Sequence, residues 1–180
     1  SEAKDKESQA KIADLGQRLN VALARKVQEL NRYRSDFFGK LKEALGDRSD
    51  FQIVGDRFLF PSDVLFDSGS SAIKPEATPQ LDQLAAALNE LEGKIPGDIA
   101  WVLRVDGHTD IKPIATPEFP SNWELSSARA IAVVRYLMLH NVPPNRLVAA
   151  GFGEFQPIDA SDGDDALRKN RRIELKLTER

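Results

Sequence analysis

The stretch IAWVLRVDGHTD, residues 99–110, decides the fold of this chain. Its first nine residues form a partly continuous hydrophobic run, which predicts a strand at a central position of a sheet with helices over one face. A histidine, a threonine and an aspartate follow where this strand ends. Because ligands of α/β sheets usually bind just beyond the carboxyl ends of the strands, Asp110 stands at a candidate binding position.

Helical patterns flank this strand on both sides. Thr78-Pro79 predicts a helix start, with Thr78 as the N-cap and Pro79 in the first helical position, and the apolar spacing stops near Gly93. The sequence SNWE, residues 121–124, has the form of a capping box. It predicts a second helix that ends by Asn141, before a Pro-Pro pair.

Three further segments have the composition of strands. Short apolar runs on both sides of Gly55-Asp56 predict a hairpin. RLVAAGFG, residues 146–153, predicts another strand, and NRRIELKLT, residues 170–178, alternates apolar and polar side chains as a half-exposed strand does. The order after residue 50 is hairpin, helix, strand, helix, strand, strand. This order predicts an α/β (α+β) two-layer sandwich with two helices against one sheet.

A long helix is predicted ahead of this sandwich. The first 45 residues contain no proline, and their apolar side chains recur at intervals of three and four, with Arg34 interrupting the repeat. One narrow apolar stripe does not stabilise a long helix alone. Two arrangements therefore stay open: the helix folds back on its own domain, or it forms a stalk that pairs two copies into a homodimer. We predict a helical segment over residues 1–48 and a globular domain over residues 49–180.

Charge and composition exclude several classes of function. Acidic and basic residues are interspersed and the net charge is −3, which argues against a nucleic-acid partner. The one basic run, RKNRR at residues 168–172, stands beside DGDD, and we predict a solvated turn rather than a phosphate site. The absence of cysteine excludes disulfides, iron–sulfur clusters and thiolate zinc sites.

The sequence shows no membrane span and no signal peptide. The most apolar stretch, AIAVVRYLML, is interrupted by Arg135 and is shorter than a span requires. The chain opens on Ser1 rather than methionine, from which we expect a mature or excised fragment.

Asp110 and Arg129 together match a zwitterionic ligand. Asp110 can accept hydrogen bonds from an ammonium group, and Arg129, about two turns into the second helix, can bind a carboxylate through two parallel hydrogen bonds. The helix start near Asn122 adds N–H groups that favour an anion. The spacing leaves an alternative open, in which Asp110 caps a turn and Arg129 pairs with a surface acid.

A catalytic or metal site is not indicated. No serine stands in a nucleophile elbow, and the chain has no cysteine nucleophile, so we expect no enzyme. The two histidines, His108 and His140, lie on separate elements without metal-ligand spacing, so neither a metal nor a cofactor is predicted. We predict that His108 is structural and holds its loop by hydrogen bonds.

Four motifs in order resemble the OmpA-like peptidoglycan-binding domain: VDGHTD, SNWELSSARA, GFGEFQPI and NRRIEL, preceded by VLFDSGSSAIKPEA. The resemblance covers roughly residues 63–178. HTDIKPI followed by FPSNWELSSARA is similar to the branch of the family formed by the flagellar stator protein MotB. The resemblance implies a β-α-β-α-β-β sandwich that binds peptidoglycan noncovalently, typically at meso-diaminopimelate in the stem peptide.

The resemblance also implies which residues bind the ligand. The family's arginine in NRR falls on Arg171 or Arg172, of which we favour Arg172. The implied ligand-binding set is Asp110, Arg129, Asn122, Thr109, Leu125 and Arg172. By the same resemblance we expect a periplasmic domain of an inner-membrane-anchored, stator-type protein of a Gram-negative bacterium and a MotA-like membrane partner. The pattern of the long helix adds the expectation of a homodimer. The alternative is a structural or interaction module of a membrane complex. In that case the long helix mediates assembly, and the domain binds peptidoglycan weakly or not at all.

Overall fold

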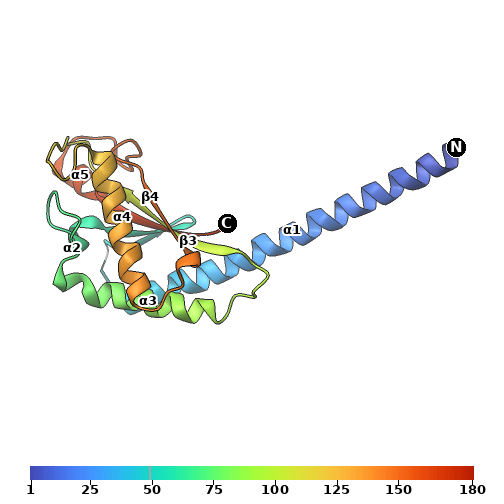
Figure 1. Cartoon of the computed structure of the whole chain (residues 1–180), viewed down its shortest axis with the longest axis horizontal. Helices are drawn as coiled ribbons and strands as arrows, with labels where there is room; N and C mark the ends of the chain where they lie inside the picture. The colour runs from blue at the N-terminus through green and yellow to red at the C-terminus, as the bar shows by residue number, and fades with distance from the viewer. Residues whose placement is uncertain (49) are drawn as a thin grey trace.

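The protein consists of a long helix and a five-stranded sheet with helices packed on one face (Figure 1). The computed structural model describes residues 1–48 and 50–180. The helices and strands are α1 (Glu2–Leu45), β1 (Gln52–Val54), β2 (Arg57–Pro61), α2 (Ser62–Leu65), α3 (Thr78–Glu92), β3 (Trp101–His108), α4 (Asn122–Leu139), β4 (Leu147–Gly151), α5 (Asp164–Asn170) and β5 (Arg172–Glu179), with single 3-10 turns at Pro75–Ala77 and Pro144–Arg146.

The sheet has the order β1-β2-β5-β3-β4, so β3 lies inside it as the sequence predicts. β3 pairs antiparallel with β5 and parallel with β4, while β1 and β2 form the predicted hairpin beside β5. Leu103 and Val105 of β3 and Leu175 of β5 are fully buried in the core. The predicted two-layer sandwich is confirmed.

Two elements were not predicted, the short helices α2 and α5. Helix α5 takes up the first half of the basic run RKNRR, and Arg172 at its end is only 3% exposed. The prediction of a solvated turn is therefore wrong, because the turn is helical and its last arginine enters the sheet.

The helix starts follow the predicted chemistry with one correction. The Ser121 hydroxyl accepts a hydrogen bond from the Trp123 N–H and also bonds Glu124, so the predicted cap of α4 is present. Thr78 is already helical and α3 begins after Ala77, so its prediction as an N-cap is wrong. A single 3-10 turn precedes Thr78, and the Thr78 hydroxyl donates to the Pro75 carbonyl of that turn.

Helix α4 packs directly on the backbone of the sheet at two strand residues that are glycines. A Cβ on Gly107 would stand 2.2 Å from the Ser126 carbonyl oxygen, and a Cβ on Gly151 would stand 2.1 Å from the Ser127 hydroxyl. Any side chain there would push α4 off β3 and β4. These glycines thus fix the distance between the start of α4 and the loop after β3.

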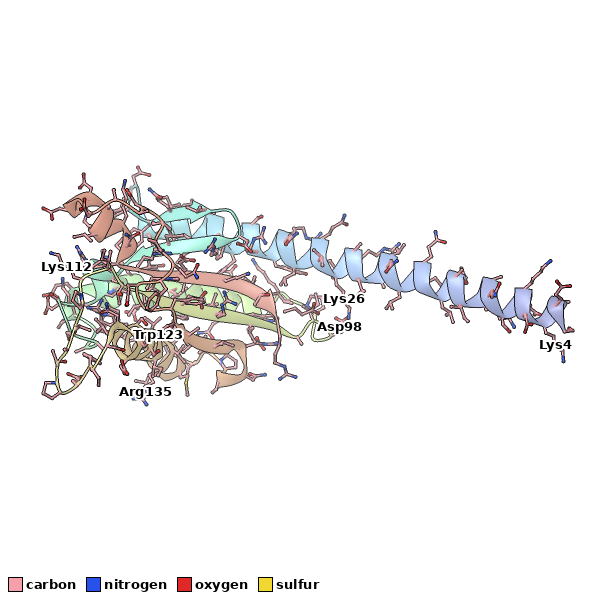
Figure 2. All side chains as sticks on the ribbon, turned by 90° about the horizontal axis from the view of Figure 1, so that it is seen from above. Lys4, Lys26, Asp98, Lys112, Trp123 and Arg135 are labelled. Carbon is pink, nitrogen blue, oxygen red and sulfur yellow. The ribbon has the colours of Figure 1, made fainter. Side chains whose placement is uncertain are left out.

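Helix α1 has a docked end and a projecting end. Phe37, Phe38 and Leu41 are buried in the domain core, and Lys40 bonds Glu90 of α3. The earlier turns extend away from the domain, with Lys4 far from the sheet (Figures 1 and 2). The projecting part therefore does not fold back on its own domain. The predicted boundary between residues 48 and 49 falls at a residue outside the described part of the chain.

The projecting part of α1 carries exposed apolar side chains. Six of them are between 47% and 69% exposed: Ile12, Leu15, Leu19, Val21, Leu23 and Val27. Among the described residues, no helix is long and apolar enough to cross a membrane.

Candidate functional site

The loop after β3 places Asp110 in a partly closed site. The Asp110 side chain is about one-tenth exposed. Its Oδ1 accepts from the Lys112 backbone N–H at 3.0 Å, and its Oδ2 accepts from Nη1 of Arg171 at 2.7 Å. The turn-capping contact that we left open from the sequence is present, and the same carboxylate also has a cationic partner. Asp110 is thus held in position through both of its oxygens.

Arg171 links Asp110 to a second carboxylate, Asp63. Its Nε and Nη2 donate to the two oxygens of Asp63, each at 3.0 Å, in a bidentate pair. The hydrogen bond with Asp63, followed by the one with Asp110, raises the pKa of Arg171 above its ordinary value. Sequence reasoning did not select Asp63, which is the first residue of the region that resembles the family. The contact joins residues 108 positions apart, which no local pattern reveals.

Arg129 is a buried cation, only 4% exposed. Its Nε donates to the Ser70 carbonyl at 2.8 Å and its Nη2 to the Asp67 carbonyl at 3.1 Å, and the guanidinium lies over the Phe66 ring. Burial lowers the pKa of Arg129, while the negative charges of Asp63 and Asp110 oppose this effect. Arg129 therefore holds the loop before α3 and forms no ion pair with a surface acid among the described residues.

One nitrogen of the Arg129 guanidinium, Nη1, makes no hydrogen bond to the described part of the chain. Asp110 influences Arg129 electrostatically but shares no hydrogen bond with it. A buried guanidinium with a spare donor can bind an acidic ligand group without first breaking an internal ion pair.

Three further predicted residues are buried, and two of them bond the loop. The Thr109 N–H donates to the Gly153 carbonyl at 2.9 Å, and the Asn122 side-chain amide donates to the Lys112 carbonyl at 3.0 Å. Leu125 is 5% exposed on the inward face of α4. All three are buried, and the hydrogen bonds of Thr109 and Asn122 hold the loop in shape.

The two arginines of NRR have different partners: Arg171 is the C-cap of α5 and Arg172 is the first residue of β5. Arg172 donates to Glu174 and to the carbonyls of Asn170 and Gln156 at 2.7 to 3.1 Å. Arg171, not Arg172, reaches Asp110. The geometry thus favours Arg171 over our first choice, Arg172, as the arginine of the site.

A broad groove adjoins the site. It has a volume of about 1080 Å³, and both Asp63 and Arg171 line it, as does Arg172. Basic residues from α5 and from the loop before α3 also line it, namely Lys74, Arg168 and Lys169. Asp110 and Arg129 are not among its lining residues. The Asp63–Arg171 pair therefore stands between this groove and Asp110.

His108 has a structural environment that differs from the prediction. Its ring stacks on Phe152 with a centroid distance of 4.8 Å and an interplanar angle of 12°. Neither ring nitrogen has a hydrogen-bond partner in the described chain, although Glu174 Oε2 lies 3.5 Å from Nε2. The predicted hydrogen bonds are therefore wrong. Burial is the main cause that lowers the pKa of His108, to about 4, so the ring is neutral.

The described residues disfavour two other kinds of ligand, an anion at the start of α4 and a metal ion. Glu124 already places a carboxylate in the first turn of α4, bonded to Ser121. Its charge complements the positive end of the helix and competes with an external anion there. Among the described residues, no group of three or more histidine, aspartate or glutamate side chains could hold a metal ion.

Known proteins share this fold and these motifs. The sequence model of the OmpA family matches residues 65–171. The protein YtxE of Bacillus subtilis is 37% identical over 113 residues, which are 62% of this chain and 43% of that protein. The chain spans about half the length, or less, of YtxE and of two outer membrane A proteins that it also matches.

Two solved structures have the same architecture. A MotB-like protein from Desulfovibrio vulgaris is 26% identical with a TM-score of 0.66, over 88% of this chain and 95% of that one. The cell wall anchor of the type VI secretion system from Pseudomonas aeruginosa is 29% identical with a TM-score of 0.61, over 84% and 97% of the two chains. The resemblance to the OmpA-like domain and its MotB-like branch is confirmed. With the sheet order, the ordered motifs and the match across residues 65–171 in agreement, the chain belongs to the OmpA family.

Proposed function

We propose that this chain is a noncovalent anchor to peptidoglycan and that it binds the stem peptide at meso-diaminopimelate. The observation that carries this proposal is the cluster of Asp110, Arg171, Asp63 and Arg129, in which Nη1 of the Arg129 guanidinium has no hydrogen-bond acceptor among residues 1–48 and 50–180. The chemistry is binding alone, without a catalytic step. The similar protein from Pseudomonas aeruginosa is a cell wall anchor, which supports this class of function.

The charges of the cluster suit a zwitterion. Two carboxylates and two guanidinium groups sum to zero, so a ligand end that carries one ammonium and one carboxylate adds no unbalanced charge to a half-buried site. The ligand carboxylate accepts a hydrogen bond from Nη1 of Arg129. The ligand ammonium donates to Asp110, where it competes with Nη1 of Arg171. Arg171 keeps its bidentate ion pair with Asp63 in either case.

We further propose that the protein works at the cell envelope as a homodimer. The exposed apolar residues on the projecting part of α1 are the observation that supports pairing, since a second copy can cover them. Two linked sites on one polymer bind more tightly than a single site. By analogy with the MotB-like relatives, the domain is periplasmic, its protein is anchored in the inner membrane of a Gram-negative bacterium, and a MotA-like protein is its membrane partner.

The same exposed stripe favours a second candidate. In this alternative the chain is an assembly module that uses α1 to join a membrane complex and binds the wall weakly or not at all.

Co-sedimentation with purified diaminopimelate-type peptidoglycan tests the proposal. We expect the wild type to pellet, and Asp110→Asn and Arg129→Lys each to weaken binding about tenfold or more, because each removes a charge or a donor geometry that the ligand needs. Asp98→Asn and Arg135→Lys are the matched controls: both residues are exposed, and Figure 2 shows where they lie.

Each variant is first checked for a native thermal transition, because Arg129 also holds the loop before α3. A wild type that stays in solution contradicts the anchor and favours the assembly module. Equal binding by all five folded proteins means that wall contact occurs elsewhere on the chain.

A further inference from the structure

Two aromatic side chains are stacked on the surface near the site. Trp123 and Phe155 have a centroid distance of 5.1 Å and an interplanar angle of 29°, yet they are 51% and 56% exposed. Trp101, the other tryptophan, is 1% exposed. Large apolar rings that remain this open cost free energy in water and often mark a contact surface. We call the Trp123–Phe155 pair the aromatic platform.

Gly153 forms the floor of the aromatic platform. Its φ of +62° favours glycine, and a Cβ there would lie 3.3 Å from the Phe155 ring and 3.6 Å from the Trp123 ring. The Gly153 N–H donates to the Ser126 hydroxyl at 3.0 Å. The two rings of the platform therefore rest on a backbone segment that is itself held by a hydrogen bond.

The same backbone segments hold the aromatic platform and the loop that carries Asp110. The Gly153 carbonyl accepts from the Thr109 N–H, directly before Asp110. Trp123 follows Asn122, which binds the Lys112 carbonyl, in the first turn of α4. Trp123 and Lys112 both lie in the half of the domain remote from the free end of α1 (Figure 2). A ligand held at Asp110 thus has an aromatic surface within the same loop system.

We propose that the aromatic platform is a second subsite that binds a sugar ring of the peptidoglycan glycan strand. This inference rests on the proposed function, since it assigns the part of the same polymer that carries the stem peptide. The C–H face of a pyranose is apolar and packs flat on an aromatic ring, while its hydroxyl and amide groups stay in water. Two rings are far too small for a stable contact between copies, which buries about 800 Å² on each partner.

Fluorescence tests the proposal because Trp123 is the exposed tryptophan and Trp101 is buried. The probes are glycan oligosaccharides without stem peptides, and a free stem tripeptide that ends in diaminopimelate. We expect the oligosaccharide to protect Trp123 from acrylamide quenching and the tripeptide to leave the quenching unchanged.

Calorimetry with a disaccharide-tripeptide gives the second readout. Trp123→Ala and Phe155→Ala are expected to weaken its binding about tenfold each and to leave binding of the free tripeptide unchanged. Trp123→Phe, which keeps an aromatic face, is expected to restore most of the affinity. Leu139→Ala is the control, since Leu139 is an 81% exposed apolar residue at the other end of α4.

The outcomes separate this inference from the proposed function. Tripeptide binding without glycan protection overturns the subsite and leaves the stem-peptide site standing. Glycan protection without tripeptide binding supports the subsite and counts against the stem-peptide site. A change of oligomeric state in Trp123→Ala, measured by analytical ultracentrifugation, identifies the platform as a contact between copies and overturns the proposal.

Discussion

Replacing His108 with phenylalanine should remove a large part of the acid sensitivity of this protein. His108 is 4% exposed, its ring stacks on Phe152, and neither nitrogen has a hydrogen-bond partner among the described residues. Phenylalanine keeps the stacked ring and loses no hydrogen bond. The change removes the titration of His108 together with its 3.5 Å contact to the buried Glu174 carboxylate.

The size of the effect follows from the lowered pKa of His108. The pKa is about 4 in the folded protein and 6.5 in the unfolded chain. Above pH 6.5 both states are neutral and His108 contributes no pH dependence. As the pH falls below 6.5, the unfolded chain binds a proton that the folded protein does not, so the free energy of unfolding decreases. At 1.36 kcal/mol per pKa unit, the loss is about 2 kcal/mol at pH 5 and about 3 kcal/mol at pH 4.

Urea unfolding of wild type and His108→Phe at pH 7, 6 and 5 measures this difference. We expect the two free energies of unfolding to lie within about 1 kcal/mol at pH 7. By pH 5, His108→Phe should have gained about 2 kcal/mol relative to the wild type. His140→Phe replaces the other histidine, at an exposed position, and is the control for a histidine-to-phenylalanine change. A difference between wild type and His108→Phe that does not change with pH would refute the reasoning.

Three further outcomes are expected. Gly107→Ala should lower the melting temperature strongly or prevent folding, because its Cβ would meet the Ser126 carbonyl at 2.2 Å, whereas Gly97→Ala, with open space around it, should melt like the wild type in calorimetry. Asn170→Ala should cost about 2–3 kcal/mol in urea unfolding, because its buried amide makes three hydrogen bonds to one loop; a loss under 0.5 kcal/mol would contradict this. Leu19→Asp should shift a dimer to monomer in analytical ultracentrifugation without changing the melting of the domain, and a wild type that is monomeric at all concentrations would contradict pairing through α1.

Local pattern was sufficient for much of the fold. The apolar run of residues 99–107 predicts an inner strand, and β3 is one, because a strand covered by helices must be hydrophobic on its core face. Ser121 predicts the start of α4 because an N-cap is a contact between residues two or three positions apart. The ordered motifs also predicted the family, which the match across residues 65–171 confirms.

Tertiary structure alone decided the partners. Asp63 bonds Arg171 across 108 residues, and Arg129 bonds carbonyls about 60 residues away, so no spacing in the sequence shows either contact. The choice between Arg171 and Arg172 depended on the register of β5, because a shift of one residue exchanges the two faces of a strand. His108 looked like a hydrogen-bonded loop residue and is a stacked, neutral one, since its pKa depends on how deeply the fold buries it.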